Sequence, residues 1–540
     1  MSTTAERARE PKVDSSDRGG RHAFLVASGI FASRIAGLVR QRVFAHYFGL
    51  SAAADVFSAA FRIPNFLQNV FGEGVLSASF IPAYARLLAR DDEEEAGRLA
   101  GAIATLLALI VAVIVLVGVI AAPALTGILA GGFEGEKRAL TVRLVRILFP
   151  GAGLLVLSAW CLGILNSHRR FLLSYMAPVI WNVAMIATLI AGGRTVAGAS
   201  LETLALWLAW GSVIGSALQF LVQLPAVLRL VPRLHLGIGR GNEHVREVTR
   251  SFGPVFIGRG VSQISAFVDV VIASYLPTGA VTAISNAQTL YMLPVSLFGM
   301  AVSAAELPAM SAVGGDEESV AAILRARVAA GLRRLAFFVV PSGVAFLAIG
   351  DVLATIVFRS GRFTSADARY VWAILAGSAV GLLAATSGRL YSSVLYARRD
   401  TKTPLRFAVV RVALTIALGY LFALHLPRWL GLSPRWGASG LTASAGLAAW
   451  VEFALLRRAV QARIGHVDVS RRNLALVYLS ALVAAAVAWG EWRLVHGMPR
   501  LPSAVLTTAL YGAVYLGMTT LLRIPEASAL VGRVARRRAR

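Results

Sequence analysis

The sequence predicts an all-α integral membrane protein with about 14 transmembrane helices, arranged as two parallel six-helix lobes plus two C-terminal helices. Of its 540 residues 57% are hydrophobic and only 15% are charged, whereas soluble domains carry about 25% charged residues. Apolar stretches long enough to cross a bilayer, which takes about 20 residues, recur along the whole chain. A sequence repeat, described below, divides most of these stretches into two sets.

Fourteen segments match the length and apolar character of a membrane span. They are 22–47, 54–86, 97–122, 140–166, 170–192, 203–228, 250–275, 279–312, 328–357, 367–396, 404–426, 437–460, 472–493 and 501–522. The second and eighth segments are longer than a bilayer requires, and they contain Pro64 and Pro294. Because proline lacks an N–H group and clashes with the preceding turn, we expect both helices to be kinked.

Basic residues gather in every second connection between these segments. They include Arg169, Arg170, Arg229, Arg233, Arg325, Arg327, Arg398, Arg399, Lys402, Arg457 and Arg458. The alternate connections at 47–54 and 276–279 carry no charge. Since Lys and Arg concentrate in cytoplasmic loops, this pattern predicts that both chain ends are cytoplasmic.

The chain therefore divides into five predicted regions. These are a disordered cytoplasmic tail (1–21), an N-lobe of helices 1–6 (22–230), a C-lobe of helices 7–12 (247–462), helices 13 and 14 (470–523), and a basic cytoplasmic tail (524–540). The first apolar run is interrupted by arginines, which is untypical of a cleaved signal peptide. We expect it to stay as the first membrane helix.

An internal repeat supports the two lobes. Ser77–Ala83 (SASFIPA) recurs as Ser303–Ala309 (SAAELPA), an offset of 303 − 77 = 226; Tyr47 pairs with Tyr275 (275 − 47 = 228); and Leu165–Arg169 pairs with Leu395–Arg399 (395 − 165 = 230). Six helices separate the copies, so the lobes are expected to share one orientation, with an axis along the membrane normal. Transporters with parallel repeats bind their cargo between the lobes near mid-membrane.

Composition excludes several classes of function. The net charge of +25 is explained by basic loops, so we expect no nucleic-acid partner. Cys161 is the only cysteine, which excludes an intramolecular disulfide. The sequence has no HExxH and no Walker A pattern, so we expect no cofactor and no ATP-driven step. The energy source would be the membrane potential, a monovalent ion gradient or another protein. A membrane transferase with one acidic catalyst is an alternative.

Several arginines in the first two segments predict a positively charged cavity for an anionic cargo. A charge inside the membrane costs at least about 2.5 kcal/mol, so it faces water or a polar partner. Arg34 and Arg40 lie six residues apart, or about 120° around an ideal helix. A bend or unwound turn at Gly37 would let both reach one cavity. Arg42 lies nearer the outer end and is expected to extend to the lipid headgroups.

Further polar residues extend this predicted site. Arg62, Asn65 and Gln68 are candidate cargo contacts, and Arg259 is the candidate in the second lobe; Glu73 and Asp269 are candidate charge-balancing acids. Asp55 has two open roles: it stabilises a helix N-terminus, or it pairs with an arginine of the first helix as an outer gate. Arg389 and Arg411 are interpreted as loop-type positive charges, and Glu306 as an interfacial acid.

Over helices 1–12 the chain also resembles the MurJ/MviN lipid II flippases of the multidrug/oligosaccharidyl-lipid/polysaccharide exporter superfamily. The resemblance rests on SRIAGLVRQ (33–41), ADVFSAAFRIPNFLQNVFGEG (54–74), SASFIPAYA (77–85) and the later ARRDTKTPLRFAVVRV (397–412). It implies export of an undecaprenyl-linked glycolipid, lipid II, to the outer leaflet of the bacterial inner membrane by alternating access. It also maps the family's essential first-helix arginines onto Arg34 and Arg40, and its helix-2 acids onto Asp55 and Glu73.

The resemblance has departures. The family's further arginines in helices 2 and 8 fall on Gln68 and Thr289. Our hypothesis is that Arg62 and Arg259 restore the positive field from other positions. The favoured function is a lipid II flippase for cell-wall synthesis, with membrane lipids and cell-wall synthesis proteins as further partners. The alternatives are a flippase for another polyprenyl-linked oligosaccharide, and an ion-coupled small-molecule exporter.

Overall fold

Every regular element in the described residues is a helix. The computed structural model describes residues 15–195, 200–494 and 499–530, and their side chains except those of residues 15–27, 72–75, 77, 78 and 254–266. Eleven of the described helices are long and apolar enough to cross a membrane. The three expected spans outside these eleven, 22–47, 54–86 and 250–275, are the ones that carry the arginines and acids singled out from the sequence.

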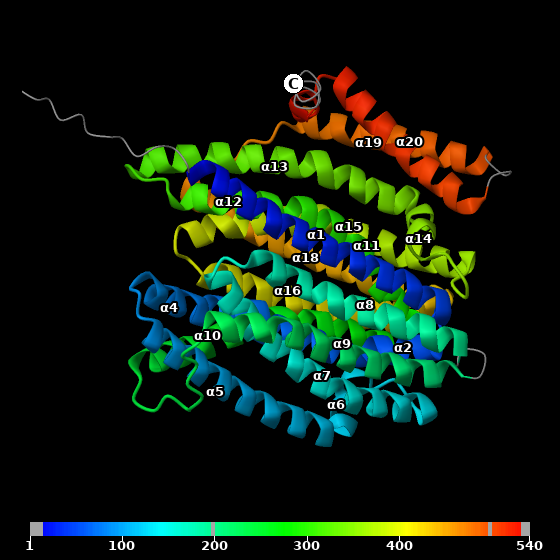
Figure 1. Cartoon of the computed structure of the whole chain (residues 1–540). Coiled ribbons are helices and arrows are strands. Elements are labelled where there is room, and N and C mark those ends of the chain that lie inside the picture. Colours follow the sequence, from blue (N-terminus) through cyan, green and yellow to red (C-terminus); the bar gives the residue numbers. More distant parts are fainter. Residues whose placement is uncertain (1–14, 196–199, 495–498, 531–540) are drawn as a thin grey trace, which may run out of the picture.

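The first half of the chain, residues 15–230, folds into helices that pack mainly on one another. Its elements are α1 (Ser15–Phe48), α2 (Ala52–Ala60), α3 (Arg62–Leu67), the π-helix η1 (Gln68–Leu76), α4 (Ser77–Ala89), α5 (Glu93–Ile120), α6 (Ala122–Leu129), α7 (Gly135–Ser167), α8 (Phe171–Thr195) and α9 (Leu201–Leu230). Helix α8 packs between α1 and α9, and α7 packs on α5 and α9. Figure 1 shows α5, α6 and α7 along one side of the molecule.

The second half, residues 243–464, repeats this pattern. Its elements are α10 (Glu243–Ser274), α11 (Ala280–Pro294), the π-helix η2 (Val295–Met300), α12 (Ala301–Ser311), α13 (Glu317–Ala348), α14 (Gly350–Phe358), α15 (Ser365–Ala397), α16 (Lys402–Tyr420), η3 (Leu421–His425), α17 (Leu426–Trp429), η4 (Pro434–Trp436) and α18 (Gly437–Ile464). Helices α15 and α18 approach closely at two glycines. A Cβ added to Gly381 would lie only 2.3 Å from Cα of Gly446, so a larger residue would not fit there. Small residues permit such packing between membrane helices.

The repeat found in the sequence has matching backbone structure. Arg169 and Arg399 both adopt φ 59°, the left-handed conformation. The residue after each arginine donates its N–H to a leucine carbonyl. Arg170 donates to Leu165, and Asp400 donates to Leu395. The π-helices η1 and η2 begin at Gln68 and Val295, an offset of 295 − 68 = 227. The kinks expected at Pro64 and Pro294 are confirmed as interruptions of the α-helix in both halves.

Helices α19 (Arg471–Leu494) and α20 (Arg500–Leu521) pack on α13 and α14 at one edge of the molecule (Figure 1). Pro341 lies inside α13 and lacks the N–H group that would bond to the Phe337 carbonyl four residues earlier. The Tyr515 hydroxyl of α20 donates to that carbonyl at 2.6 Å, and the Tyr511 hydroxyl donates to the Pro341 carbonyl at 2.7 Å. The proline in α13 therefore creates the acceptor that anchors α20.

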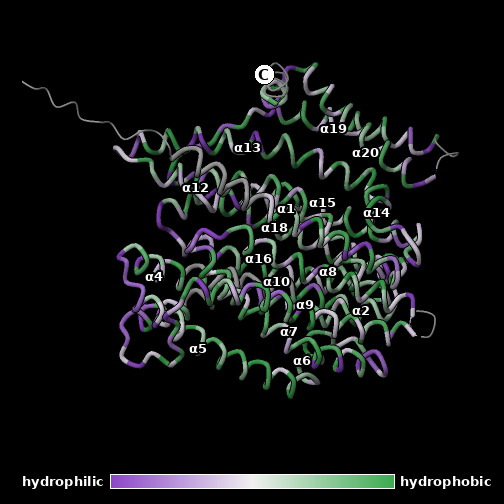
Figure 2. The backbone as a smooth tube through the Cα atoms, in the orientation of Figure 1, coloured by the Kyte–Doolittle hydropathy of each residue, from purple (hydrophilic) through white to green (hydrophobic). Residues whose placement is uncertain are grey.

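Hydrophobic residues fill the middle of the helices, and hydrophilic residues gather toward their ends (Figure 2). The described surface carries many exposed apolar side chains, among them Val113 and Leu116 of α5 and Trp210 of α9. A soluble protein rarely exposes so many together, whereas lipid-facing helices do. The fold is that of an integral membrane protein.

Candidate functional site

A cavity of about 260 Å³ lies between the two halves, lined by both charged and aromatic side chains. Its lining residues from the first half are Arg40, Gln41, Phe44, Phe57, Ser58, Phe61, Arg62, Asn65, Met185, Leu189 and Leu208; those from the second half are Ser285, Gln288, Thr289 and Met292. The second half contributes one helix, α11, and no charged residue to this lining. All the charge on the cavity wall therefore comes from the first half.

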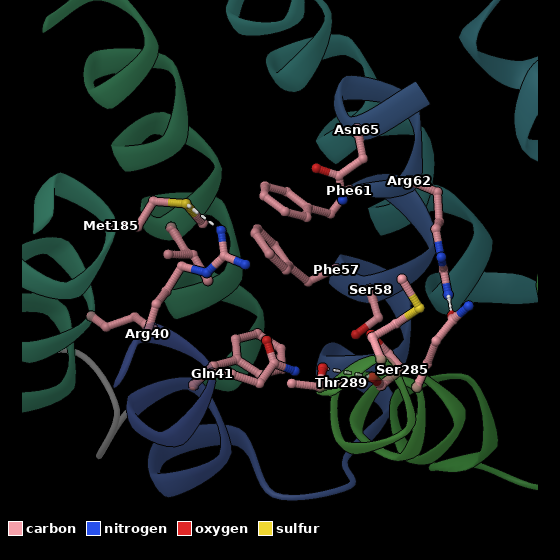
Figure 3. Close-up of a pocket in the computed structure, with 15 residues that line it drawn as sticks. Arg40, Gln41, Phe57, Ser58, Phe61, Arg62, Asn65, Met185, Ser285 and Thr289 are labelled. Carbon is pink, nitrogen blue, oxygen red and sulfur yellow. Dashed lines mark hydrogen bonds between the residues drawn. The ribbon is translucent and has the colours of Figure 1, made fainter. Parts of the chain in front are cut away.

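Arg40 is held in the cavity by aromatic rings rather than by an acid. Its guanidinium lies 5.2 Å from the ring centre of Phe61 and 5.4 Å from that of Trp181, within cation–π range. It also donates to Sδ of Met185 at 3.7 Å. No carboxylate pairs with Arg40 in the described part of the chain. Figure 3 shows its side chain extending toward Met185 and Phe61. The positive charge is oriented but not neutralised, which suits an anionic ligand.

Arg62 reaches the opposite side of the cavity (Figure 3). Its guanidinium donates to Oε1 of Gln288 in the second half at 2.9 Å, and it interacts electrostatically with Asp269. A second bond between the halves runs from Nε2 of Gln41 to Oδ1 of Asn286 at 2.7 Å. These neutral amides satisfy polar groups across the interface without cancelling the charge of Arg62. When the halves separate, Arg62 and Gln41 can form hydrogen bonds with a ligand in place of Gln288 and Asn286.

Asp55 joins the halves at one end of the cavity. Its side chain is 1% exposed and accepts hydrogen bonds from the backbone N–H groups of Gly279 (2.7 Å) and Thr282 (2.9 Å). Lys137 of the first half completes the cluster at 3.2 Å. Gly279 has φ 96°, which glycine adopts readily, and it precedes the first residue of α11. The carboxylate therefore stabilises the N-terminus of a helix in the other half.

This arrangement confirms one role expected for Asp55 and corrects the other. Asp55 stabilises a helix N-terminus, that of α11 in the second half, but its cationic partner is Lys137 rather than an arginine of the first helix. Backbone N–H groups at a helix start are strong partners for a carboxylate, since they carry the positive end of the helix dipole. Asp55 thus forms a latch between the halves, and its action as an outer gate stays a prediction.

Contacts at the opposite end of the molecule are more exposed. Arg86 of α4 pairs with Glu247 of α10 at 2.5 Å, and both side chains are about half exposed. Asn242, which caps α10, donates to Glu95 of α5. An exposed ion pair contributes about 0–1 kcal/mol. The polar contacts at this end are therefore weaker than those of Asp55.

The structure brings together some of the predicted site residues and separates others. Arg40, Arg62 and Asn65 line the cavity, whereas Arg34 is exposed and donates to Ser296 Oγ at 3.2 Å in the second half. Gln68 is half-buried in η1 and is not part of the cavity wall. Asp269 interacts electrostatically with Arg62 and Arg411. The side chains of Glu73 and Arg259 lie outside the described residues.

Several other expectations are wrong. Helix α1 stays α-helical through Gly37, so no bend brings Arg34 to the same cavity as Arg40. Arg42 does not extend to the headgroups but donates to the carbonyl of Ile356 at 2.6 Å. Arg411 pairs with Glu452 at 3.0 Å between α16 and α18, and is not a loop-type charge. Glu306 is buried and pairs with Arg327 and Arg334 of α13, and its position at the membrane interface stays a prediction.

The sequence reading missed the residues that position the arginines. Trp181 and Phe61 stack at 5.6 Å beside Arg40, and Lys137 holds Asp55. Aromatic residues in an apolar segment give no sign of whether they face lipid or a cavity. Lys137 stands out only as a lysine next to the expected span 140–166, on the side where the loops are poor in charge.

Comparisons with known proteins agree on one family. Residues 44–500 match the family described as "Lipid II flippase MurJ". The lipid II flippase MurJ of Burkholderia cenocepacia is 30% identical over 92% of this chain and 96% of its own length. The probable lipid II flippase MurJ of Vibrio cholerae is 29% identical over 88% of this chain and 90% of its own length.

Solved structures agree on the fold. A structure of lipid II flippase MurJ in an inward closed conformation superposes with a TM-score of 0.75 at 23% identity, covering 92% of this chain and 98% of the other. A multidrug resistance MATE family transporter of the MOP superfamily superposes with a TM-score of 0.62 at 17% identity, covering 82% of this chain and 98% of the other. By sequence, over nearly its whole length, the chain belongs to the lipid II flippase MurJ family.

Proposed function

We propose that this protein is a transporter, not an enzyme, that flips lipid II across the inner membrane as a multi-pass membrane protein. One observation carries the proposal: this chain belongs to the MurJ family, and its Arg40 and Arg62 line a cavity between the two halves. Lipid II presents a pyrophosphate and peptide carboxylates, which guanidinium groups bind through charge-assisted hydrogen bonds. Flipping supplies the precursor for peptidoglycan synthesis at the outer surface.

The finer architecture belongs to the same proposal. It consists of 14 membrane helices in two parallel six-helix lobes, with α19 and α20 appended and both chain ends in the cytoplasm. The matched turns at Arg169 and Arg399 support the repeat, and the basic loops support the orientation. With this orientation, Asp55 lies at the outer side and the Arg86–Glu247 pair at the cytoplasmic side.

The size of the cavity indicates how the halves must move. Drug-sized ligands fill about 300–1,000 Å³, and the cavity of about 260 Å³ is smaller than that range. The sugar and peptide parts of lipid II therefore require the halves to separate. The exposed cytoplasmic contacts separate at lower cost than the buried Asp55 cluster. Cargo then enters from the cytoplasmic side, and release follows when the Asp55 latch opens.

Each charged residue has a role in this cycle. Arg40 and Arg62 bind the pyrophosphate and carboxylates, with Arg34 and Arg259 along the path and Asn65 and Gln68 as neutral contacts. Asp269 and Glu73 balance the arginines when no cargo is bound, which allows the empty carrier to return. The polyprenyl tail stays in lipid or on the surface of α19 and α20. The membrane potential or a monovalent ion drives the cycle, and cell-wall synthesis proteins receive the product.

At the positions of Gln68 and Thr289 the family has arginines, and Arg62 supplies the positive charge that these arginines would supply. Its side chain and that of Thr289 line the same cavity, so the charge of Arg62 acts on the space that an arginine at Thr289 would have occupied. The departures at these two positions also favour a second candidate function. This is the flipping of another polyprenyl-linked oligosaccharide, whose phosphate groups would meet the same two arginines.

Depletion of the protein in its native cell tests the proposal. Lipid II exposure at the outer leaflet is measured with a membrane-impermeant lipid II-degrading enzyme, and we expect exposure to fall as the protein is depleted. Wild-type protein and the matched control Arg98→Gln, which changes an exposed arginine of α5 paired with Glu94, should restore it. Unchanged lipid II exposure, together with accumulation of another glycolipid at the inner leaflet, would overturn the favoured cargo.

A further inference from the structure

A second cavity, of about 490 Å³, lies where α14 ends and where α15 and α20 begin. It is separate from the cavity between the halves. Its lining consists of Thr355, Arg359, Ser360, Gly361, Phe363, Thr364, Ser365, Arg500 and Leu501. We call it the outer arginine cavity, because the proposed orientation places it at the outer membrane surface. Two positively charged side chains and no acidic one line it.

The two arginines of this cavity lie close enough to repel each other. Burial and the charge of Arg500 both lower the pKa of Arg359. The Arg500 guanidinium donates to Ser365 Oγ at 2.6 Å. In the described part of the chain, the Arg359 guanidinium forms no ion pair or hydrogen bond. Two guanidinium groups that line one cavity without an acid favour an anion in it.

The nearby acids are engaged elsewhere. Asp367 accepts from the backbone N–H and hydroxyl of Thr364 at 2.8 and 2.9 Å, which closes a capping box on α15. Asp351, at the start of α14, interacts electrostatically with Arg369 and Arg493. Neither carboxylate lines the cavity. The positive charge of Arg359 and Arg500 is therefore available to a ligand.

Neutral groups adjoin the same space. Ser365 and Leu501 lie in the first turns of α15 and α20, where helical N–H groups have no partner within the helix. The hydroxyl oxygen of Ser360 is buried and has no hydrogen-bond partner in the described structure. An anion with several oxygen atoms could accept from the arginines and from these groups together. A phosphate group has this geometry, and guanidinium groups bind it bidentately.

The position of these arginines is unusual for a membrane protein. Lys and Arg are normally sparse on the outer side. Yet the outer end of this edge carries Arg359, Arg362, Arg369, Arg493 and Arg500. On α20, Leu501 and Val505 follow the cavity one turn apart, and both are exposed. A phosphate bound at the arginines would have its lipid chains beside this apolar face.

We propose that the outer arginine cavity binds the phosphate group of a membrane lipid in the outer leaflet, with Arg359 and Arg500 as its ligands. The inference goes beyond the proposed flipping activity, because it requires no cargo in the central cavity. An occupied site would fix the start of α20 against α14 and α15. The lipid is identified by its phosphate, which a bulk phospholipid and a lipid-linked pyrophosphate share.

Native mass spectrometry of the purified full-length protein tests the proposal. The probe is dioleoyl phosphatidylglycerol, added to protein that has been stripped of lipid by detergent exchange. We expect the double variant Arg359→Gln/Arg500→Gln to weaken binding by at least about tenfold, because it removes both charged donors. Arg359→Lys/Arg500→Lys keeps the charge and should retain most of the binding. Arg362→Gln/Arg369→Gln removes two outer charges outside the cavity lining and should change binding less than about threefold.

Three further measurements decide between outcomes. Size exclusion and thermal unfolding of each variant must match the wild type, and the Lys pair provides a folded comparison if the Gln pair does not. Competition with lipid II and with inorganic phosphate identifies the source: displacement of phosphatidylglycerol by lipid II at micromolar concentration supports the proposal. Equal phosphatidylglycerol binding by the Arg359→Gln/Arg500→Gln variant overturns it. Inorganic phosphate that binds as tightly as the lipids overturns the assignment to a membrane lipid.

Discussion

The two halves of the molecule share a backbone plan but divide the polar chemistry between them. The first half brings the charged groups Asp55 and Arg62 to the central interface, and their hydrogen-bond partners in the second half are neutral. Asp269 of the second half acts on Arg62 only through its charge. Arg62 contacts Gln288, which is 226 residues later, and Asp55 contacts Thr282, which is 227 residues later. The sequence repeat has offsets between 303 − 77 = 226 and 395 − 165 = 230. Each charged group therefore meets a residue at or near its own repeat position.

Contacts between repeat-equivalent positions explain why the halves had to diverge. Residues near an axis that relates two halves face their own counterparts. If both halves carried the same charge there, Arg would face Arg and Asp would face Asp, and like charges in a low-dielectric site repel strongly. The second half avoids this by offering Gln288 and the N-terminal N–H groups of α11. A charged cavity between repeat-equivalent positions requires asymmetry.

The largest effect is expected from Arg40, whose hydrogen bond and ring contacts in the described residues all lie in the first half. Arg40→Gln removes the guanidinium held between Phe61 and Trp181. Truncating one partner of a desolvated charged contact costs about 2–5 kcal/mol, so lipid II binding should weaken by about 30-fold or more. Complementation of a depletion strain and binding to purified protein measure this. Arg40→Lys should restore part of the affinity, since it keeps the charge but loses the planar stacking. Full complementation by Arg40→Gln would contradict the role of this residue.

The next largest effect concerns the latch. Asp55→Asn leaves Lys137 without its anion and weakens two bonds to α11. Breaking a buried ion pair costs about 3–5 kcal/mol, so we expect a shift toward states open at the Asp55 end. Spin labels on cysteines at Ala52 and Thr278, both exposed, would report the separation. Asp55→Asn/Lys137→Gln should shift less, because no charge is left unpaired. An unchanged label distance in Asp55→Asn would show that other contacts close this end.

Much of this arrangement could be predicted from the sequence, because membrane spans follow from hydropathy. The repeat followed from short matches such as Leu165–Arg169 with Leu395–Arg399, and the left-handed arginines show why these turns match. Arg40 and Arg62 stood out because charges are rare in apolar segments.

The partners of these charges could not be predicted. Asp55 binds backbone N–H groups, which every residue except proline carries, so no side chain marks them. Lys137 lies 82 residues from Asp55 and outside any motif. The aromatic rings around Arg40 are common residues in membrane helices. Arg34 was grouped with Arg40 by sequence, but the unbroken helix α1 turns the two side chains apart. These features depend on tertiary packing between distant segments.

A third prediction concerns a substitution that gives the second half the same charged residue as the first half at one position of the interface. Gln288→Arg places a second guanidinium opposite Arg62, in place of the amide oxygen that accepts from it at 2.9 Å. Two unit charges about 4 Å apart repel by about 4 kcal/mol at an effective dielectric constant near 20, part of which solvent relieves as the halves separate. We expect the central interface to open and thermal stability to fall. Gln288→Glu should instead hold Arg62 more tightly and slow transport. If Gln288→Arg matched the wild type in both assays, Arg62 would not depend on this contact.

The smallest expected effect is a difference in pH response between the two matched turns, at 165–170 and 395–400. Burial lowers the pKa of His168 in the first turn, and the charge of Arg170 lowers it further, with Glu93 acting in the opposite direction. The hydroxyl of Thr403, then its N–H, and then Arg463 hold the pKa of Asp400 in the second turn well below its usual range. Each turn is therefore most stable with His168 neutral and Asp400 ionised. Stability from His168 is lost as pH falls below about 6.5, and stability from Asp400 is lost only as pH falls below about 3.9.

Hydrogen exchange separates these two responses. Between pH 7 and 5.5, after correction for the intrinsic exchange rate, we expect faster exchange in peptides covering 165–171 and no change in those covering 395–403. Protonated His168 cannot accept from the Tyr84 hydroxyl, whose oxygen lies 3.0 Å from Nε2. His168→Asn should abolish the response of the first turn and leave the second unaffected. Equal responses in the two turns would mean that their shared backbone, rather than the different side chains at these positions, sets their stability.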